Sequence, residues 1–174
     1  MKNLTSFAQL AKEFERASRL MPVAFELSMQ KSALLVEAVA KAEIGTYQRV
    51  GMSPFPEWEE LKDSTKAAHS RAMAAGNAAP DAGVNTPLLV TGQMRADIWH
   101  EAAAMGFVVG GDKILEYQEL GTPTIPPRPV LSPAIHKSTP EILAIVGSSV
   151  EKTLAGQTPD KRSRFWNQAE VKNW

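Results

Sequence analysis

The chain has 174 residues, of which 44% are hydrophobic and 22% are charged, and its 19 basic residues balance its 19 acidic residues. A chain of this length is expected to form one domain with a proper core. The balanced charge excludes a global field that would draw the protein to nucleic acid or to an anionic membrane. The sequence contains no cysteine, which excludes disulfides, cysteine nucleophiles and zinc–thiolate sites and suits folding in a reducing cytoplasm.

Residues 5–45 predict two helices. Thr5 and Ser6 are good helix caps, and apolar residues follow at steps of three and four as far as Leu20. Pro22 suits the first turn of a second helix, which would end near Gly45. The apolar residues of this second helix spread over more than one face, which predicts burial on two sides, by the domain itself or by a neighbouring subunit. They are Phe25, Leu27, Leu34, Leu35, Val36, Val39 and Ile44.

The middle of the chain alternates between loops and short elements. Two prolines break the helix near residue 54, and Phe55, Trp58 and Leu61 are expected to anchor the following loop to the core. A short helix begins at Ser64 or Thr65 and ends at Gly76. Residues 76–87 show no periodicity, and a loop of that length is usually functional or mobile.

Residues 91–112 predict a β-hairpin. Thr91 can cap one helical turn, and Met94–Glu101 then alternate between apolar and polar residues, which favours a strand. A turn around Met105 leads into a second strand, which the glycines at 110 and 111 close.

The C-terminal third contains a short segment, a proline-rich connector and a last helix. Residues 114–120 form a short helix or an extended stretch that Gly121 ends. Three prolines around Arg128 hold it in a stiff, extended backbone. The last helix begins at Ser132 or Ser138 and ends near Leu154, and we expect Leu131 to lie in the core.

The predicted architecture is an α+β fold with N-terminal helices, a small antiparallel β-sheet and a C-terminal helix. Residues 1–155 form a single α+β domain, and residues 156–174 form a polar tail that contains Phe165, Trp166 and Trp174. We expect this tail to become ordered only by contact with something else. Early charges argue against a signal peptide, and no apolar run reaches membrane-spanning length.

A search for catalytic signatures yields only weak alternatives. The three histidines lie in different predicted elements, and a metal-dependent hydrolase would have to use His69, Asp97 and His100. The basic–aromatic patch at 161–166 supports an alternative hypothesis, a small nucleic-acid-binding module. No serine-nucleophile or phosphate-loop signature is present. We therefore predict no catalytic residue, no cofactor and no metal site.

Five short stretches occur in order between residues 54 and 135: FPEWEELKDSTKAA, TPLLVTGQMRADI, VVG, EYQELGT and IPPRPVLSPAI. Together they resemble the neck and tail-completion proteins of long-tailed bacteriophages, the virion-morphogenesis proteins of Mu-like phages and their relatives. Gln118 stands where that family commonly has histidine, and Val130 stands where phenylalanine is commoner. The resemblance marks as interface or structural candidates Trp58, Thr91, Gly92, Arg95, Tyr117, Gly121, Arg128, Pro129 and Leu131.

The resemblance implies a structural virion protein without catalytic activity. Such a protein forms a homo-oligomeric ring, with six copies as the expected number, at the neck or the top of the tail, and it joins the head to the tail or completes the attachment. Its partners would be its own copies, neck or connector proteins, and tail-tube or sheath proteins, while DNA would only pass through the channel. It would be assembled in the host cytoplasm, without a membrane.

Arg128 has two expected roles. Its guanidinium can bind a carboxylate on the next subunit or backbone carbonyl groups, or it can pair within its own subunit with Glu116 or Glu119. The glycines at 92 and 121 are expected to hold backbone angles that a β-carbon resists.

Overall fold

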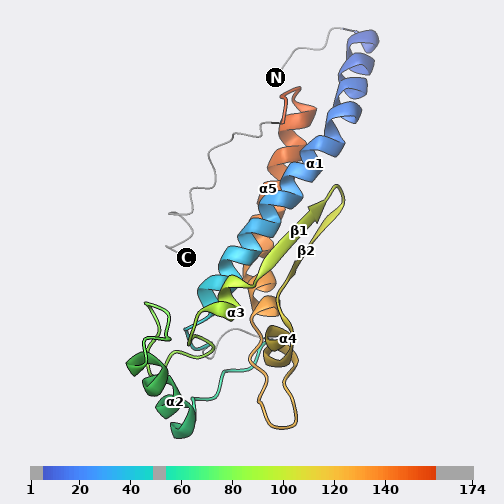
Figure 1. The fold of residues 1–174 in the computed structure, drawn as a ribbon. Helices are drawn as coiled ribbons and strands as arrows, with labels where there is room; N and C mark the ends of the chain where they lie inside the picture. The colour runs from blue at the N-terminus through green and yellow to red at the C-terminus, as the bar shows by residue number, and fades with distance from the viewer. Residues whose placement is uncertain (1–5, 49–53, 160–174) are drawn as a thin grey trace. The chain divides into compact units, whose positions relative to one another are not determined.

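The structure is a computed structural model that describes residues 6–48 and 54–159. A long helix near each end and a two-stranded antiparallel sheet between them confirm the predicted α+β class (Figure 1). None of the described helices combines the length and the apolar character needed to cross a membrane. The elements are α1 (Phe7–Glu43), α2 (Asp63–Ala74), α3 (Gln93–Ala96), β1 (Trp99–Ala103), β2 (Gly106–Gly110), α4 (Lys113–Leu120) and α5 (Leu131–Leu154).

The chain divides into two compact units, each assembled from segments that are distant in the sequence. The first, here called the helix-pair unit, combines residues 1–35, 100–108 and 138–174. The second, the loop unit, combines residues 36–99 and 109–137. Each of the two long helices is divided between the units: α1 at residues 35 and 36, and α5 at residues 137 and 138.

A single helix replaces the two helices predicted at the N-terminus. α1 runs without a break for 37 residues and contains Pro22, so the predicted boundary at that proline is wrong. A proline inside a helix removes one hydrogen bond and costs about 3 kcal/mol. Pro22 is exposed, whereas Ala17 and Ala24, before and after it, are buried. Burial of the side that carries Ala17 and Ala24 outweighs the cost of the proline, because tertiary packing supplies most helical stability.

The helix-pair unit is built on small side chains between α1 and α5. Ser28 donates a hydrogen bond to the Ala24 carbonyl oxygen at 2.8 Å, and Thr153 donates to the Ser149 carbonyl oxygen at 2.8 Å. Between the helices, the Ser149 hydroxyl donates to the Ala24 carbonyl oxygen at 3.2 Å. The buried hydroxyl groups are therefore satisfied while the two helices approach closely.

The core of the loop unit takes one or two large apolar side chains from each of several segments. Val36 comes from α1, Ile98 precedes β1, Leu115 comes from α4 and Val130 precedes α5, and each is at most 2% exposed. Leu131 was expected in this core but is only half-buried. The prediction was wrong by one position, because the side chain that points inward at the start of α5 is that of Val130.

The hairpin is confirmed, but its first strand begins later than predicted. Thr91 accepts a hydrogen bond from the Gln93 amide at 3.2 Å, but the N-cap of the helical turn is Gly92 rather than the predicted Thr91. The turn continues as α3, so Met94, Arg95 and Ala96 are helical and β1 begins only at Trp99. The alternation that predicted a strand from Met94 is overridden by this local turn.

The remaining elements lie close to their predicted positions. α2 is helical as expected, and α4 adopts the helical one of its two predicted conformations. It begins where the Asp112 carboxylate accepts from the Leu115 amide at 2.9 Å. α5 begins at Leu131, which fits the earlier of the two predicted starts and excludes Ser138. Residues 76–87 contain no helix or strand, as predicted.

Candidate functional site

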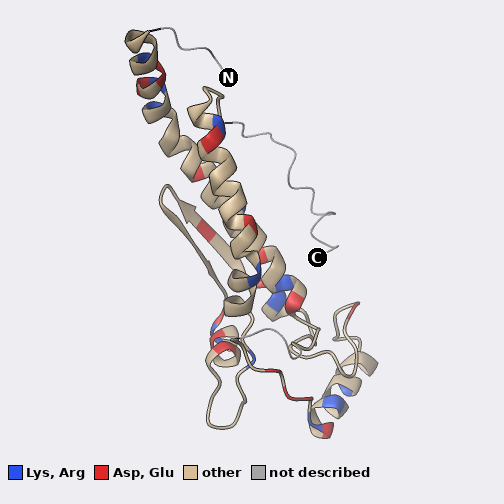
Figure 2. Cartoon of the chain, turned by 180° about the vertical axis from the view of Figure 1, so that it is seen from behind, with Lys and Arg blue, Asp and Glu red and all other residues tan. Residues whose placement is uncertain are grey.

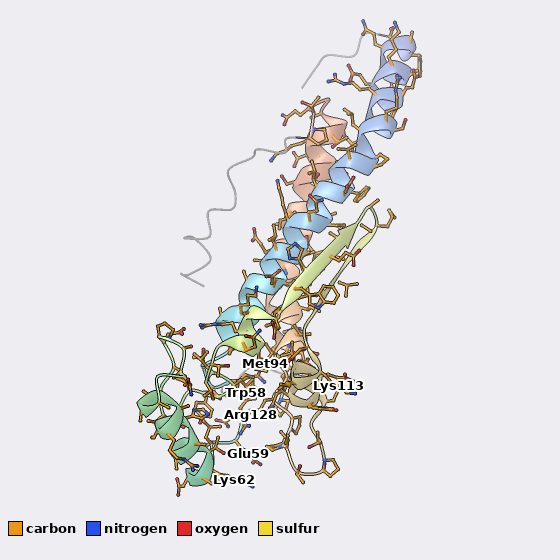
Figure 3. The ribbon with its side chains drawn as sticks, viewed as in Figure 1. Trp58, Glu59, Lys62, Met94, Lys113 and Arg128 are labelled. Atoms are coloured by element: carbon orange, nitrogen blue, oxygen red, sulfur yellow. The ribbon has the colours of Figure 1, made fainter. Side chains whose placement is uncertain are left out.

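All nine candidate residues belong to the loop unit, although they come from distant parts of the sequence. They lie at four features: the start of α5, the start of α3, the segment 54–61, and the second half of α4 with its end at Gly121. The labelled side chains of Trp58, Glu59 and Arg128 in Figure 3 come from two of these features. The candidate site is therefore a set of junctions between helices and loops.

Glu119, at the end of α4, caps the start of α5. One carboxylate oxygen accepts from the amides of Val130 at 2.7 Å and Leu131 at 2.9 Å. The other accepts from the amide of Ser132 at 2.9 Å and from its hydroxyl at 2.5 Å. The first amides of a helix lack partners within it and carry partial positive charge, so a carboxylate is well placed there. No pattern in the sequence predicted this role.

The connector between α4 and α5, residues 121–130, is here called the strap. It leaves α4 at Gly121, whose φ of +75° lies in the left-handed region and whose amide donates to the Tyr117 carbonyl oxygen at 3.0 Å. A β-carbon at this glycine would lie 3.1 Å from Pro127. Thr122 and Ile125 then exchange backbone hydrogen bonds that close a tight turn. The expectation that Gly121 holds an angle unfavourable for other residues is confirmed.

Arg128 is held within its own chain by backbone groups. Its amide donates to the Gln118 carbonyl oxygen at 2.6 Å, and its guanidinium donates to the Glu59 carbonyl oxygen at 3.2 Å (Figure 3). The carboxylate of Glu119, one of the two partners predicted within the chain, binds the start of α5 instead. The neighbouring Pro129 is buried. Arg128 therefore ties the strap to the segment that contains Trp58.

The segment 54–61 is anchored as predicted. Trp58 is only 4% exposed, and its amide donates to the Gln48 carbonyl oxygen at 3.1 Å. The Leu61 amide donates to the Tyr47 hydroxyl at 3.0 Å. Phe55 packs edge-on against the His136 ring, with 5.7 Å between ring centroids. These contacts hold the segment to Tyr47 and Gln48, which follow α1, and to His136 on α5.

Arg95 holds the long loop against α3. Its guanidinium binds both carboxylate oxygens of Asp81, at 2.6 and 2.9 Å. This pairing lowers the pKa of Asp81 and raises the pKa of Arg95. Gly92, with φ +81°, begins α3, and a β-carbon there would lie 3.3 Å from Ala79. The bidentate geometry fixes the loop in one position relative to α3.

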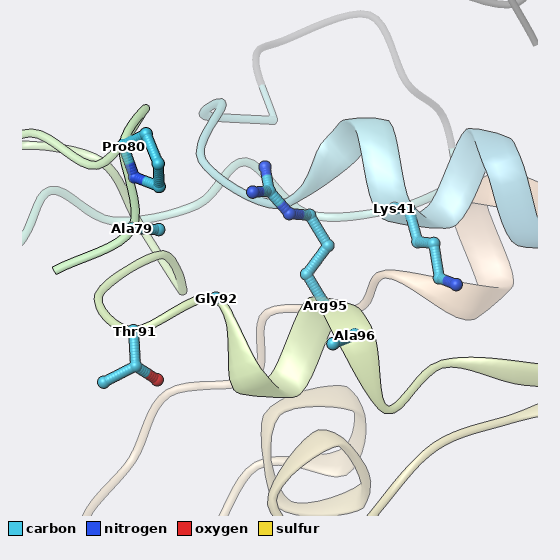
Figure 4. A pocket seen from close by; sticks show the side chains of 7 residues that line it. All are labelled: Lys41, Ala79, Pro80, Thr91, Gly92, Arg95 and Ala96. Carbon is cyan, nitrogen blue, oxygen red and sulfur yellow. The ribbon is translucent and has the colours of Figure 1, made fainter.

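An open hollow of about 460 Å³ lies beside this ion pair (Figure 4). Both of its cations already have a carboxylate partner: Arg95 binds Asp81, and Lys41 binds Glu37. The hollow therefore presents no free positive charge to an anion. Its lining residues are Lys41, Ala79, Pro80, Thr91, Gly92, Arg95 and Ala96.

Tyr117, the last of the candidates, lies on the outer side of α4. Tyr117 is 43% exposed, and the Lys113 ammonium lies 5.9 Å from the ring centroid. This distance is within the range of a cation–π contact. Tyr117 is thus an exposed candidate, as Thr91 is, and its aromatic ring can contact another molecule.

The described residues bear on only one of the two alternative functions, the metal-dependent hydrolase. Within residues 6–48 and 54–159, no three His, Asp or Glu side chains come together to hold a metal ion. His69 is buried, with its Nδ1 atom 3.3 Å from the Gly83 carbonyl oxygen. The basic–aromatic patch at 161–166 lies outside the described residues. Figure 2 shows both signs of charge side by side along the first part of α1.

The chain was also compared with known proteins. No family model, no curated protein and no solved structure matches it.

Proposed function

We propose that this chain is a structural subunit of a long-tailed phage virion, placed at the neck or the upper end of the tail. It acts by assembling with copies of itself and with neighbouring neck and tail proteins, and it catalyses no reaction. One observation carries the proposal: several residues in the stretches that resemble the phage family hold loops and helix ends in place. Gly121, Arg95 and Arg128 each fix a loop or a helix end, and Glu119 fixes the start of α5.

A ring subunit needs this kind of construction. Every copy must present the same loop conformations, because each subunit of a closed ring meets the next through two different faces. Backbone segments tied by charged and bidentate hydrogen bonds keep one conformation better than loops held by apolar contacts alone. The tied segments 54–61, 76–91 and 121–130 are therefore suited to form part of a repeated interface.

The long helices offer apolar surface for such an interface. Val23 and Leu34 on α1 are 40% and 45% exposed, and Leu143 on α5 is 66% exposed. Burial of side chains of this kind supplies most of the free energy of association between subunits. A copy number of six is proposed from the family resemblance.

A phage that lacks the protein provides the test. We expect DNA-filled heads and separate tails in lysates examined by electron microscopy, and infectious particles should be lost. Supplying the wild-type protein or a Glu116→Ala variant should restore joined virions, whereas Glu119→Ala should restore them poorly. Normal joined virions without the protein would refute the proposal, and so would a failure to make DNA-filled heads.

A reconstruction of the intact virion tests the ring itself. We expect a closed ring of identical copies with residues 54–61 or 121–130 at the contact between neighbours. A single isolated copy of the protein in the particle would contradict the proposed assembly.

A further inference from the structure

The beginning of α1 carries large apolar side chains that no described residue covers. Phe7 is 90% exposed and Phe14 is 60% exposed, whereas Ala17 and Ala24 further along the helix are 5% and 1% exposed. At steps of seven and three residues, Phe7, Phe14 and Ala17 lie along one side of the helix. The buried side of α1 therefore continues as an apolar surface beyond the point where burial stops.

The pairing of the helices explains where burial stops. α5 runs antiparallel to α1 within the helix-pair unit (Figure 1), and Ser149 bonds to the Ala24 carbonyl oxygen. Because both helices rise equally per residue, the end of α5 at Leu154 lies beside about residue 19 of α1. Residues 7–16, here called the overhang, lie beyond that point and span roughly 15 Å at 1.5 Å per residue.

The chain turns at the end of α5 and continues with an aromatic sequence. Gly156 adopts φ +78°, and the Gln157 amide donates to the Lys152 carbonyl oxygen at 2.9 Å, which ends the helix. Phe165 and Trp166 follow Pro159 by six and seven residues. Six residues of extended chain reach roughly 20 Å, which exceeds the length of the overhang.

We propose that Phe165 and Trp166 bind the overhang of their own chain, against Phe7 and Phe14. This inference goes beyond the proposed function and does not depend on it. The attachment point next to the overhang gives the two aromatic residues a high effective concentration there, which a second molecule lacks. Aromatic pairs also gain free energy from offset and edge-to-face contacts in addition to burial.

A disulfide cross-link in the full-length chain tests the contact, since the natural sequence has no cysteine to interfere. Ala11 lies between Phe7 and Phe14 on the same side of α1, and Lys12 lies on the other side. In an Ala11→Cys and Asn167→Cys variant, an intramolecular disulfide should form about tenfold faster than in a matched Lys12→Cys and Asn167→Cys variant. Equal rates, or cross-links mainly between two chains, would overturn the proposal.

Hydrogen exchange tests the energetic part of the same contact. A helix end without packing frays, so Trp166→Ser should make the amides of residues 8–16 exchange about tenfold faster. Trp174→Ser serves as the matched control and should leave those amides unchanged, and the amides of α5 should not change in either variant. Unchanged exchange at residues 8–16 in Trp166→Ser would overturn the proposal.

Discussion

The two units of the chain are stabilised in different ways. In the loop unit, long stretches without helix or strand are held by side chains that bond to the backbone, such as Glu119 at the start of α5. In the helix-pair unit, buried hydroxyl groups such as that of Ser28 bond to their own helix, and the helices meet through small side chains. Irregular backbone thus depends on a few specific bonds, whereas the helix pair depends on close packing along its length.

The segment from residue 76 to residue 91, which contains the predicted loop 76–87, shows how many side-chain bonds can hold irregular backbone. The Thr86 hydroxyl accepts from the Gly83 amide at 2.9 Å and lies within hydrogen-bond distance of the carbonyl oxygens of Gly83 and Leu89. The Tyr47 hydroxyl donates to the side chain of Asn85 at 2.7 Å. A loop that its length alone marked as functional or mobile is therefore tied at several points.

The largest effect is expected from removal of the Glu119 carboxylate. Glu119→Ala leaves the first amides of α5 without a partner, so the free energy of unfolding should fall by about 2–3 kcal/mol. Chemical denaturation measures this difference. Glu116→Ala changes an exposed carboxylate on the same helix and should stay within about 0.5 kcal/mol of the wild type. A loss below that size for Glu119→Ala would show that the cap is not important for stability.

The same contrast explains which features of the fold could be predicted from the sequence and which could not. The hairpin and α5 were found from periodicity and turn residues, because those signals are local, whereas α4 was left open between a helix and an extended segment. The partners of Glu119 lie 11 to 13 residues away, and the Glu59 carbonyl that binds Arg128 lies 69 residues away. No spacing rule links residues so far apart, so the contacts that hold the loops could not be predicted.

Two errors have the same origin. The predicted break at Pro22 and the predicted strand at Met94 both came from correct local rules. Packing around Ala24 overrides the first, and the helical turn that begins at Gly92 overrides the second. At Pro22, contacts made by the folded chain outweigh the local preference of the residue, whereas at Met94 one local preference outweighs another.

The packing of the helix pair should fail when a small side chain is enlarged. Ala24→Leu places extra volume where the Ser149 hydroxyl approaches the backbone, and it should cost about 1–3 kcal/mol of unfolding free energy. Val23→Leu, at the exposed neighbouring position, should change stability by less than about 0.5 kcal/mol. Thermal and chemical unfolding of both variants would decide the matter. Equal stability of the two would contradict close packing at Ala24.

Glycine substitutions should have opposite effects in the two units. Gly121→Ala in the loop unit forces a β-carbon into a left-handed backbone and toward Pro127, at a cost of about 1–2 kcal/mol. Gly147 lies inside α5 of the helix-pair unit, and a β-carbon there would meet no neighbouring atom within 4 Å. Gly147→Ala should therefore stabilise the protein by about 0.5–1 kcal/mol, since glycine weakens a helix interior. Unfolding curves of the two variants measure both effects, and destabilisation by both substitutions would show that α5 is constrained at Gly147 by something else.

The smallest effect is expected from Glu43, a buried carboxylate in the last turn of α1. Burial raises the pKa of Glu43 above its ordinary value of 4.5, and the nearby Glu119 carboxylate acts in the same direction. The Lys137 ammonium, 2.8 Å from one carboxylate oxygen, opposes this shift without cancelling it. The folded chain therefore binds the Glu43 proton more tightly than the unfolded chain does.

This shift predicts the direction of a pH dependence. The stabilising contribution of a raised pKa is present below the unfolded value and is lost as the pH rises through the folded value. Glu43→Gln removes the titrating proton. When the pH falls from 7 to 4, the free energy of unfolding of the wild type should therefore rise by up to about 1 kcal/mol relative to that of this variant. Glu26→Gln, at an exposed position of α1, is the matched control for the removal of a carboxylate. Denaturation curves at the two pH values measure both differences, and a Glu43→Gln difference that does not change with pH would contradict the raised pKa.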